Sequence, residues 1–210
     1  MKITNLLLLT LFIYIGCKSD NKRLTDNAND TKIEVQSVED SLLQITDRGL
    51  TFSNGTSEFL PFADDPEATI IVMVRHTEQD TVGDDPDLTA TGQARAERLA
   101  NMIKDFPLNL IYTNAFERTV KTAQPSAYLH QQAIQFYDHE TAADFISTIA
   151  KNGQGLHLLV VGRANTVPEM LNTLAGEKRF PDIDESDYSN IYIIGISESG
   201  QRVNIIRAIY

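Results

Sequence analysis

Four short polar segments of the 210-residue chain carry arginine, histidine and carboxylate side chains, and each closely follows an apolar run. The imidazole of histidine acts as a nucleophile and proton carrier near neutral pH. Guanidinium groups bind anions through paired hydrogen bonds, and carboxyl groups donate or accept protons. Brought together, these groups would bind an anion and react with it. The segments are Arg75-His76-Thr77-Glu78, Glu117-Arg118-Thr119, Asp138-His139-Glu140 and Gly162-Arg163-Ala164-Asn165-Thr166.

Most of these residues also have an ordinary structural explanation. A lone arginine near the start of a helix, such as Arg118, is usually a solvated surface residue, and His139 is typical of an exposed loop. Glu140 is equally explained as a charge at a helix N-terminus, stabilised by the helix dipole. Arg75 and His76 differ because they emerge side by side from an apolar run, where burying charge is costly without partners. This pair therefore points to a binding site.

The apolar pattern predicts the elements that position these segments. Continuous apolar runs rich in β-branched residues are typical of strands buried on both faces of a parallel sheet. Helical periodicity predicts a helix after each of the first four strands, the first capped by Thr91 and the second broken near Pro125. The predicted strands are residues 68–74, 108–114, 134–138, 156–162, 190–197 and 203–210, and the predicted helices are residues 89–106, 115–130, 142–153 and 168–176.

Strands that alternate with helices indicate an α/β domain. We expect a three-layer sandwich in which a mostly parallel central sheet has helices on both faces and an antiparallel hairpin at its C-terminal edge. Ligands of such folds bind at the carboxyl ends of the strands. The four polar segments all follow the predicted carboxyl ends, so they should converge at one edge of the sheet.

The N-terminus resembles a bacterial lipoprotein signal. An apolar run from Leu6 to Ile15 has the length of a signal-peptide core and is short for a membrane span, and Cys17, the only cysteine, closes it. Tyr14 departs from the small or aliphatic residue usual three places before that cysteine. The resemblance implies cleavage after residue 16, lipid attachment at Cys17 and a place in the bacterial cell envelope, on the periplasmic or outer-membrane side. An ordinary secretory signal followed by a free thiol is the alternative.

Composition divides the remainder of the chain. Residues 17–47 are rich in Asn, Asp, Ser and Thr and are predicted to form a flexible tether. Residues 48–65 form an N-terminal extension with one or two hairpins, and residues 66–210 form the main domain. The formal net charge of −11 argues against binding of nucleic acid and against attraction to an anionic membrane surface. An anionic ligand must therefore be attracted by local charge.

Four segments together resemble the histidine phosphatase superfamily, the phosphoglycerate-mutase-like group. They are VMVRHTEQD, DLTATGQARAERLA, IYTNAFERTVKTAQPSA and LVVGRANTVPEMLNTLAGE, and the similarity covers roughly residues 66–210. The resemblance implies that His76 is the nucleophile that briefly carries the phosphoryl group. It also implies that Arg75 and Arg118 hold the non-bridging phosphate oxygens, which a guanidinium fork fits in pairs.

The same resemblance implies a carboxylic acid that protonates the leaving oxygen. Glu140 is the first choice, because many family members place this acid just after the third strand, and Glu78 and Asp138 are alternatives. His139 is a further candidate for contact with the phosphate, because it follows the third strand, but an exposed loop position explains it better. No cofactor is expected, and no metal is needed where arginines neutralise the phosphate.

The chain departs from the family pattern at Arg163. The family turn normally reads Gly-His-Ser-Asn-Thr, and its histidine stabilises the charge that develops on the phosphate. Arg163 stands in place of that histidine, Ala164 replaces the serine, and Thr77 stands where glycine is commonest. Arg163 and Asn165 are still expected to bind phosphate. A guanidinium is larger than an imidazole, however, and a displacement of the phosphate of about one ångström slows in-line attack about a hundredfold.

The resemblance therefore leads to two hypotheses. The first is a membrane-tethered phosphatase of reduced activity that acts on a small phosphomonoester. The second is a catalytically inactive pseudophosphatase that binds a phosphorylated or otherwise anionic molecule. A scaffold with a vestigial site is less consistent with the retention of His76, Arg75 and Arg118, and a mutase is disfavoured by the short chain. The acidic segments 83–87 and 180–190 are expected to border the site.

Overall fold

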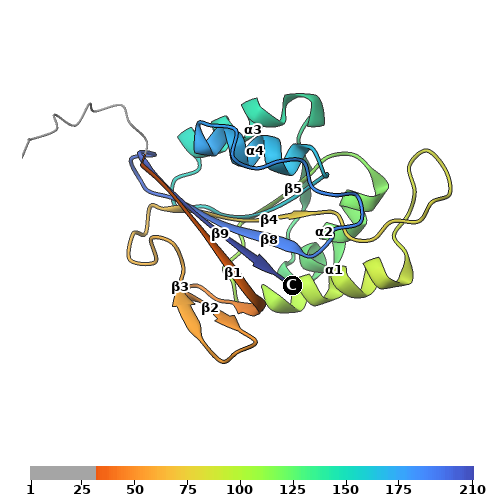
Figure 1. Ribbon diagram of the computed structural model, residues 1–210, viewed down its shortest axis with the longest axis horizontal. Coiled ribbons are helices and arrows are strands. Elements are labelled where there is room, and N and C mark those ends of the chain that lie inside the picture. Colours follow the sequence, from red (N-terminus) through yellow and green to blue (C-terminus); the bar gives the residue numbers. More distant parts are fainter. Residues whose placement is uncertain (1–31) are drawn as a thin grey trace, which may run out of the picture.

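The computed structural model describes residues 32–210 (Figure 1). The predicted lipoprotein signal, Cys17 and the first part of the predicted tether lie outside the described residues. Within the described residues, no helix is both long enough and apolar enough to cross a membrane.

Nine strands form one mixed sheet in the order β3-β2-β1-β9-β8-β4-β7-β5-β6. Strands β4, β7, β5 and β6 run parallel, and β8 runs antiparallel to both β4 and β9. Strand β1 lies parallel to β9. The strands are β1 (Lys32–Ile45), β2 (Gly49–Phe52), β3 (Ser57–Phe59), β4 (Thr69–Arg75), β5 (Leu110–Thr113), β6 (Ile134–Phe136), β7 (His157–Gly162), β8 (Asn190–Ile196) and β9 (Arg202–Ile209).

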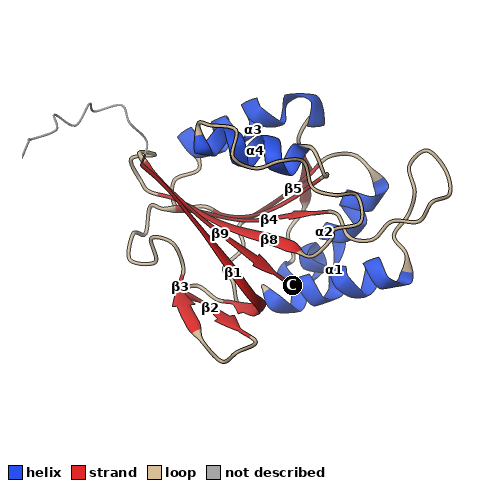
Figure 2. Ribbon diagram, viewed as in Figure 1, coloured by secondary structure: helices blue, strands red, loops and turns tan. Residues whose placement is uncertain are grey.

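Helices cover both faces of the sheet, and Figure 2 shows the three layers. Helices α1 (Ala90–Met102) and α2 (Glu117–His130) pack together on one face, and α3 (Ala142–Asn152) and α4 (Thr166–Ala175) pack together on the other. A short 3₁₀ helix, η1 (His139–Thr141), precedes α3. The predicted three-layer fold class and its antiparallel C-terminal hairpin are confirmed. The hairpin does not lie at the edge of the sheet as expected, because β1 pairs with β9 and places β1, β2 and β3 beyond it.

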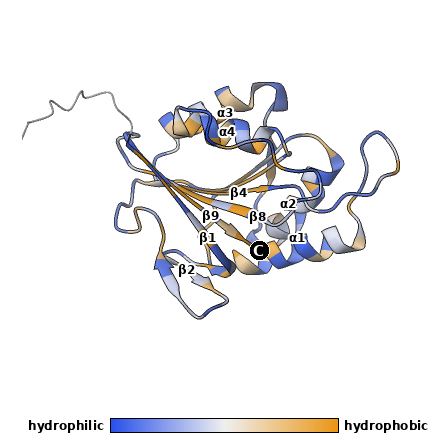
Figure 3. Cartoon of the chain, in the orientation of Figure 1, coloured by the Kyte–Doolittle hydropathy of each residue, from blue (hydrophilic) through white to orange (hydrophobic). Residues whose placement is uncertain are grey.

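The sheet separates two hydrophobic cores. Every residue of β4 is buried, and its side chains alternate between the faces: Val72 and Val74 join the core beneath α1 and α2, whereas Ile71 and Met73 join the core beneath α3 and α4. Figure 3 shows the central strands as apolar and the surrounding loops as mostly polar. Burial on both faces holds β4 rigidly, so the residues that follow it have a fixed position.

Two predicted details of the helices are wrong. Helix α1 is capped by Thr89 rather than Thr91, because the Thr89 hydroxyl accepts a hydrogen bond from the Gly92 amide. Helix α2 continues through Pro125. Buried residues on both sides of the proline, Ala123 and Ser126, hold the helix in place, and this packing offsets the lost backbone hydrogen bond.

The predicted tether is also wrong over its described part, because residues 32–45 form β1. Leu42 and Ile45 of this strand are fully buried in the core beneath α1. The strand was missed because its apolar residues are spaced irregularly among polar ones. Strands β2 and β3 form the hairpin expected in residues 48–65, and through β1 they belong to the same sheet as the main domain.

Candidate active site

The carboxyl ends of β4 and β7 border a cavity of about 390 Å³. The two ends lie side by side, because Arg75 and Gly162 are partners in the parallel register. Three of the predicted polar segments reach this cavity, together with part of the α4–β8 connection (residues 176–189). The lining residues are His76, Gln79, Arg118, Arg163, Ala164, Asn165, Asp182, Ile183 and Glu185.

His76 is held as a neutral imidazole at the cavity. Its side chain is buried, and its Nδ1 lies 2.8 Å from the carbonyl oxygen of Thr77. A carbonyl can only accept, so Nδ1 carries the proton and Nε2 keeps its lone pair. Burial lowers the pKa of His76 to about 4, and the charges of the three nearby arginines act in the same direction, against the Thr77 hydrogen bond. The imidazole is therefore uncharged at neutral pH.

The backbone after His76 is fixed by helix α2. The Thr77 amide donates to the Thr122 hydroxyl at 3.0 Å, and that hydroxyl donates to the Arg118 carbonyl oxygen at 2.7 Å. All of these groups are buried or nearly so. The Thr77 hydroxyl also lies 3.2 Å from the Thr122 hydroxyl, so both the backbone and the side chain of Thr77 connect the segment after β4 to the helix that carries Arg118.

Arg75 is held by the α4–β8 connection. Its Nη1 donates to the carbonyl oxygens of Asp184 and Asp187, at 2.8 and 3.1 Å, and its Nη2 donates to the Glu185 carboxylate at 2.6 Å. The ring of Tyr188 covers the guanidinium, with 4.3 Å between the guanidinium carbon and the ring centroid. The buried Nε has no partner among the described residues. One donor of Arg75 is therefore unused, while a carboxylate occupies another.

Arg118 and Arg163 share a single aromatic ring. Their guanidinium carbons lie 4.6 and 4.8 Å from the centroid of Phe116, an arrangement that orients both cations toward the cavity. Arg118 also donates a long hydrogen bond of 3.3 Å to Asp85, and its buried Nε is unpartnered among the described residues. Burial and the charge of Arg163 lower the pKa of Arg118, which nevertheless stays a cation at neutral pH.

Arg163 lies in the turn between β7 and α4. Its amide donates to the Thr166 hydroxyl at 2.9 Å, and its carbonyl accepts from the Val167 amide, so the backbone of the turn is fixed. Its side chain forms no hydrogen bond or ion pair with any other described residue. Asn165 lies beside it at the exposed rim of the cavity. The predicted anion-binding turn is thus at the cavity.

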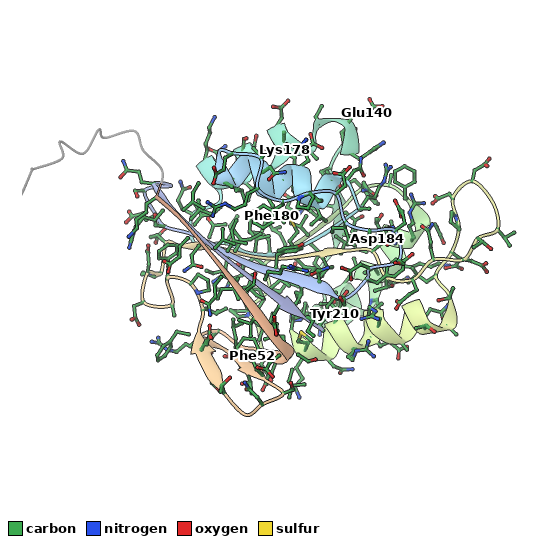
Figure 4. All side chains as sticks on the ribbon, viewed as in Figure 1. Phe52, Glu140, Lys178, Phe180, Asp184 and Tyr210 are labelled. Atoms are coloured by element: carbon green, nitrogen blue, oxygen red, sulfur yellow. The ribbon has the colours of Figure 1, made fainter. Side chains whose placement is uncertain are left out.

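The structure does not bring Glu140 to the cavity. Strand β6 is the last strand of the sheet, two places beyond β7, so the segment that follows it lies away from the carboxyl ends of β4 and β7. Asp138 caps η1 by accepting from the Glu140 amide at 2.9 Å. Figure 4 shows Glu140 at the outer surface beside α3, apart from Asp184 of the α4–β8 connection. His139 packs its ring against Phe116 and does not line the cavity.

The alternative acid Glu78 is also committed elsewhere. Arg95 donates three hydrogen bonds of 2.8 to 3.1 Å to the Glu78 carboxylate. Burial alone would raise the pKa of Glu78, but the hydrogen bonds and charge of Arg95 hold it below its ordinary value. Glu78 also does not line the cavity, so the structure does not place it where a proton donor is needed.

The sequence analysis missed Gln79, Asp182 and Glu185 as individual site residues. The segment 180–190 was expected to border the site, but its composition did not indicate which carboxylate would reach an arginine. Which carboxylate reaches an arginine depends on contacts between residues more than a hundred positions apart, such as that between Arg75 and Asp184. Among the described residues, no group of three or more His, Cys, Asp or Glu side chains could hold a metal ion.

Part of the amino-acid sequence matches one protein family. Residues 71–140 match the histidine phosphatase superfamily (branch 1). The matched segment runs from β4 through His76 and Arg118 to η1, and Arg163 lies beyond it. No curated protein sequence matches the chain.

Solved structures of several phosphatases share the fold. The mycobacterial glucosyl-3-phosphoglycerate phosphatase is 10% identical, with a TM-score of 0.53 over 66% of this chain and 97% of its own. The protein histidine phosphatase SixA, complexed with tungstate, is 16% identical, with a TM-score of 0.53 over 65% and 93%. Phosphoserine phosphatase from Entamoeba histolytica is 13% identical, with a TM-score of 0.50 over 60% and 90%. At these identities the comparison establishes the fold alone.

Proposed function

We propose that the protein hydrolyses a small phosphomonoester through a phosphohistidine at His76. The observation that carries this proposal is the neutral, buried His76, whose Nε2 lone pair is free in a cavity lined by Arg118 and Arg163. The unused buried Nε donors of Arg75 and Arg118 also favour an anionic ligand, since orphaned donors are costly. The solved relatives complexed with tungstate or inorganic phosphate support a small oxyanion as the ligand class.

In the proposed reaction the substrate phosphate lies between His76 and the guanidinium groups. Nε2 attacks phosphorus while the ester oxygen leaves, and Arg118 neutralises the non-bridging oxygens. Arg163 donates to the same oxygens from the β7–α4 turn, and Asn165 adds a donor at the rim. Water then attacks the phosphohistidine and regenerates the imidazole. The cavity volume of about 390 Å³ suits a small substrate.

We propose further that Arg163 replaces the second histidine of the family and reduces the rate. Arginine binds the phosphate in the ground state as well as in the transition state, and uniform binding of this kind does not accelerate chemistry. A specific observation favours the pseudophosphatase as the alternative: Glu185 already pairs with Arg75 at 2.6 Å, so a ligand must compete with a carboxylate for that arginine.

Turnover of p-nitrophenyl phosphate by the purified protein tests the two functions. We expect slow hydrolysis that is lost in His76→Ala and accelerated about tenfold or more in Arg163→His, which restores the shorter hydrogen-bond donor. Arg98→His, at an exposed position of α1, is the matched control and should leave the rate unchanged. No turnover in the parent, with binding of vanadate retained, would instead support the pseudophosphatase.

We also propose that Cys17 carries a lipid that anchors the protein in the bacterial cell envelope. The support is the resemblance of residues 1–17 to a lipoprotein signal. Metabolic labelling with radioactive palmitate should mark the full chain and not the Cys17→Ser variant. Equal labelling of both, or of neither, would exclude lipidation at this residue.

A further inference from the structure

A carboxyl group that protonates the leaving oxygen assists the departure of a basic leaving group, and the α4–β8 connection supplies the carboxylates at this cavity. Among the described residues, Asp182 and Glu185 are the acidic side chains that line it. Glu140 faces outward and Glu78 is held by Arg95. The acid predicted after the third strand is therefore not at the place where the reaction would occur.

Glu185, unlike Asp182, is paired with an arginine that neighbours His76 in the sequence. Its Oε2 lies 2.6 Å from Nη2 of Arg75, the residue that directly precedes His76. Its side chain remains 83% exposed, although the arginine that it contacts is 2% exposed. The carboxylate thus stands at the open side of the cavity with one oxygen on the buried cation. Asp182 forms no hydrogen bond or ion pair within the described part of the chain.

The backbone on both sides of Glu185 is fixed. The Ile183 amide donates to the Ala164 carbonyl at 2.9 Å, which ties the connection to the β7–α4 turn. The carbonyls of Asp184 and Asp187 both accept from Nη1 of Arg75. A side chain between such anchor points can rotate, but its Cα stays near the cavity. These contacts give Glu185 the defined position that proton transfer requires.

We propose that Glu185 is the general acid and base of this site, an inference that rests on the proposed phosphatase function. In the first step the Nε2–phosphorus bond of His76 forms, the bond from phosphorus to the ester oxygen breaks, and the Glu185 carboxyl gives its proton to that oxygen. In the second step a water oxygen bonds to phosphorus, the phosphorus–nitrogen bond breaks, and the Glu185 carboxylate takes the proton from that water. One phosphomonoester and one water become one alcohol and one phosphate, and the carboxyl is restored.

The contact with Arg75 explains how the same residue behaves in the empty site. The carboxylate occupies a guanidinium donor that a phosphate oxygen takes when substrate binds. A phosphate dianion at that arginine repels the negative carboxylate, so substrate binding separates Glu185 from Arg75. The Glu185 side chain is then free to lie beside the leaving oxygen.

The dependence of the rate on the leaving group tests this assignment. Nitrophenolate leaves without help, whereas phenolate, which is more basic, benefits from protonation. The ratio of kcat/KM for phenyl phosphate to kcat/KM for p-nitrophenyl phosphate reports the first step alone. In Glu185→Gln we expect this ratio to fall about a hundredfold, because glutamine has no proton to donate.

Glu177→Gln is the matched control. It is the same substitution in the same connection, but Glu177 pairs with Arg179 away from the cavity, so the ratio should not change. A ratio that falls in Asp182→Asn or Glu140→Gln and not in Glu185→Gln would overturn the assignment. An equal rise in kcat/KM for both substrates in Glu185→Gln would also overturn it, because Glu185 would then only compete with phosphate for Arg75.

The two proposals fail in different ways. If the parent hydrolyses p-nitrophenyl phosphate and His76→Ala does not, the proposed function holds, and the ratio alone decides the role of Glu185. If the parent hydrolyses neither substrate, the proposed function and the role of Glu185 fall together.

Discussion

The ring of Phe116 contacts two arginine side chains of the candidate site, Arg118 and Arg163. The guanidinium groups of Arg118 and Arg163 come from segments that follow different strands, yet both lie within 5 Å of the ring centroid. Like charges repel, and the aromatic surface offsets part of that repulsion. The position of Arg163 therefore depends on a residue that precedes α2 as well as on its own turn.

The burial of His76 makes the stability of the protein depend on pH. The pKa is lowered from 6.5 to about 4, so between these two pH values the unfolded chain takes up a proton that the folded chain does not. The contribution to stability is fully present above pH 6.5 and is lost as the pH falls toward 4. Over this range the free energy of unfolding should fall by about 3 kcal/mol more than in His76→Gln. Urea denaturation at several pH values measures it, and parallel curves for the two proteins would contradict the expectation.

At the scale of elements, the site depends on how closely α1 approaches the segment after β4. A Cβ at Gly92 would lie 2.1 Å from the carbonyl oxygen of Glu78, so glycine is required at this position of the first helical turn. The Thr89 amide donates to the same carbonyl at 2.9 Å. These contacts fix the N-terminus of α1 against the backbone of Glu78, which follows His76 by two residues.

Replacing Gly92 by alanine tests this contact. Helix propensity alone would make Gly92→Ala more stable by about 1 kcal/mol. The clash with backbone should reverse the sign and lower the free energy of unfolding by about 1–3 kcal/mol. Ala94→Gly, on the exposed side of the same helix, should cost only about 1 kcal/mol. Urea denaturation of the three proteins distinguishes the effects, and a more stable Gly92→Ala variant would rule out the clash.

The elements that the sequence predicted best are those with long apolar runs. Strands β4 and β7 were recognisable because each contains a continuous apolar run, residues 70–74 and 158–161, and the residues after them were correctly expected at the cavity. Glu140 and Glu185 show the limit of such reasoning. Glu140 follows a strand in the sequence, but that strand lies at the edge of the sheet, two places beyond β7, so Glu140 is not at the cavity. The place of Glu185 depends on hydrogen bonds to Arg75, which no local pattern encodes.

At the scale of the whole molecule, the N-terminal strand belongs to the core. Leu42 is 1% exposed and should cost about 3 kcal/mol when replaced by alanine, because a cavity would form beneath α1. The neighbouring Leu43 is 56% exposed, and Leu43→Ala should change the free energy of unfolding by less than about 0.5 kcal/mol. A tether would give small and equal effects at both positions. Thermal or urea denaturation of the two variants decides between strand and tether.

The direction of β1 has a consequence for an anchored protein. Strand β1 runs parallel to β9, and β9 runs parallel to β4 because both are antiparallel to β8. Lys32 therefore enters the sheet at the edge opposite to the one where His76 emerges from β4. An attachment upstream of Lys32 would therefore join the domain at the end of the sheet that lies opposite the mouth of the cavity. The point of attachment and the point of substrate entry would be separated by the full length of the strands.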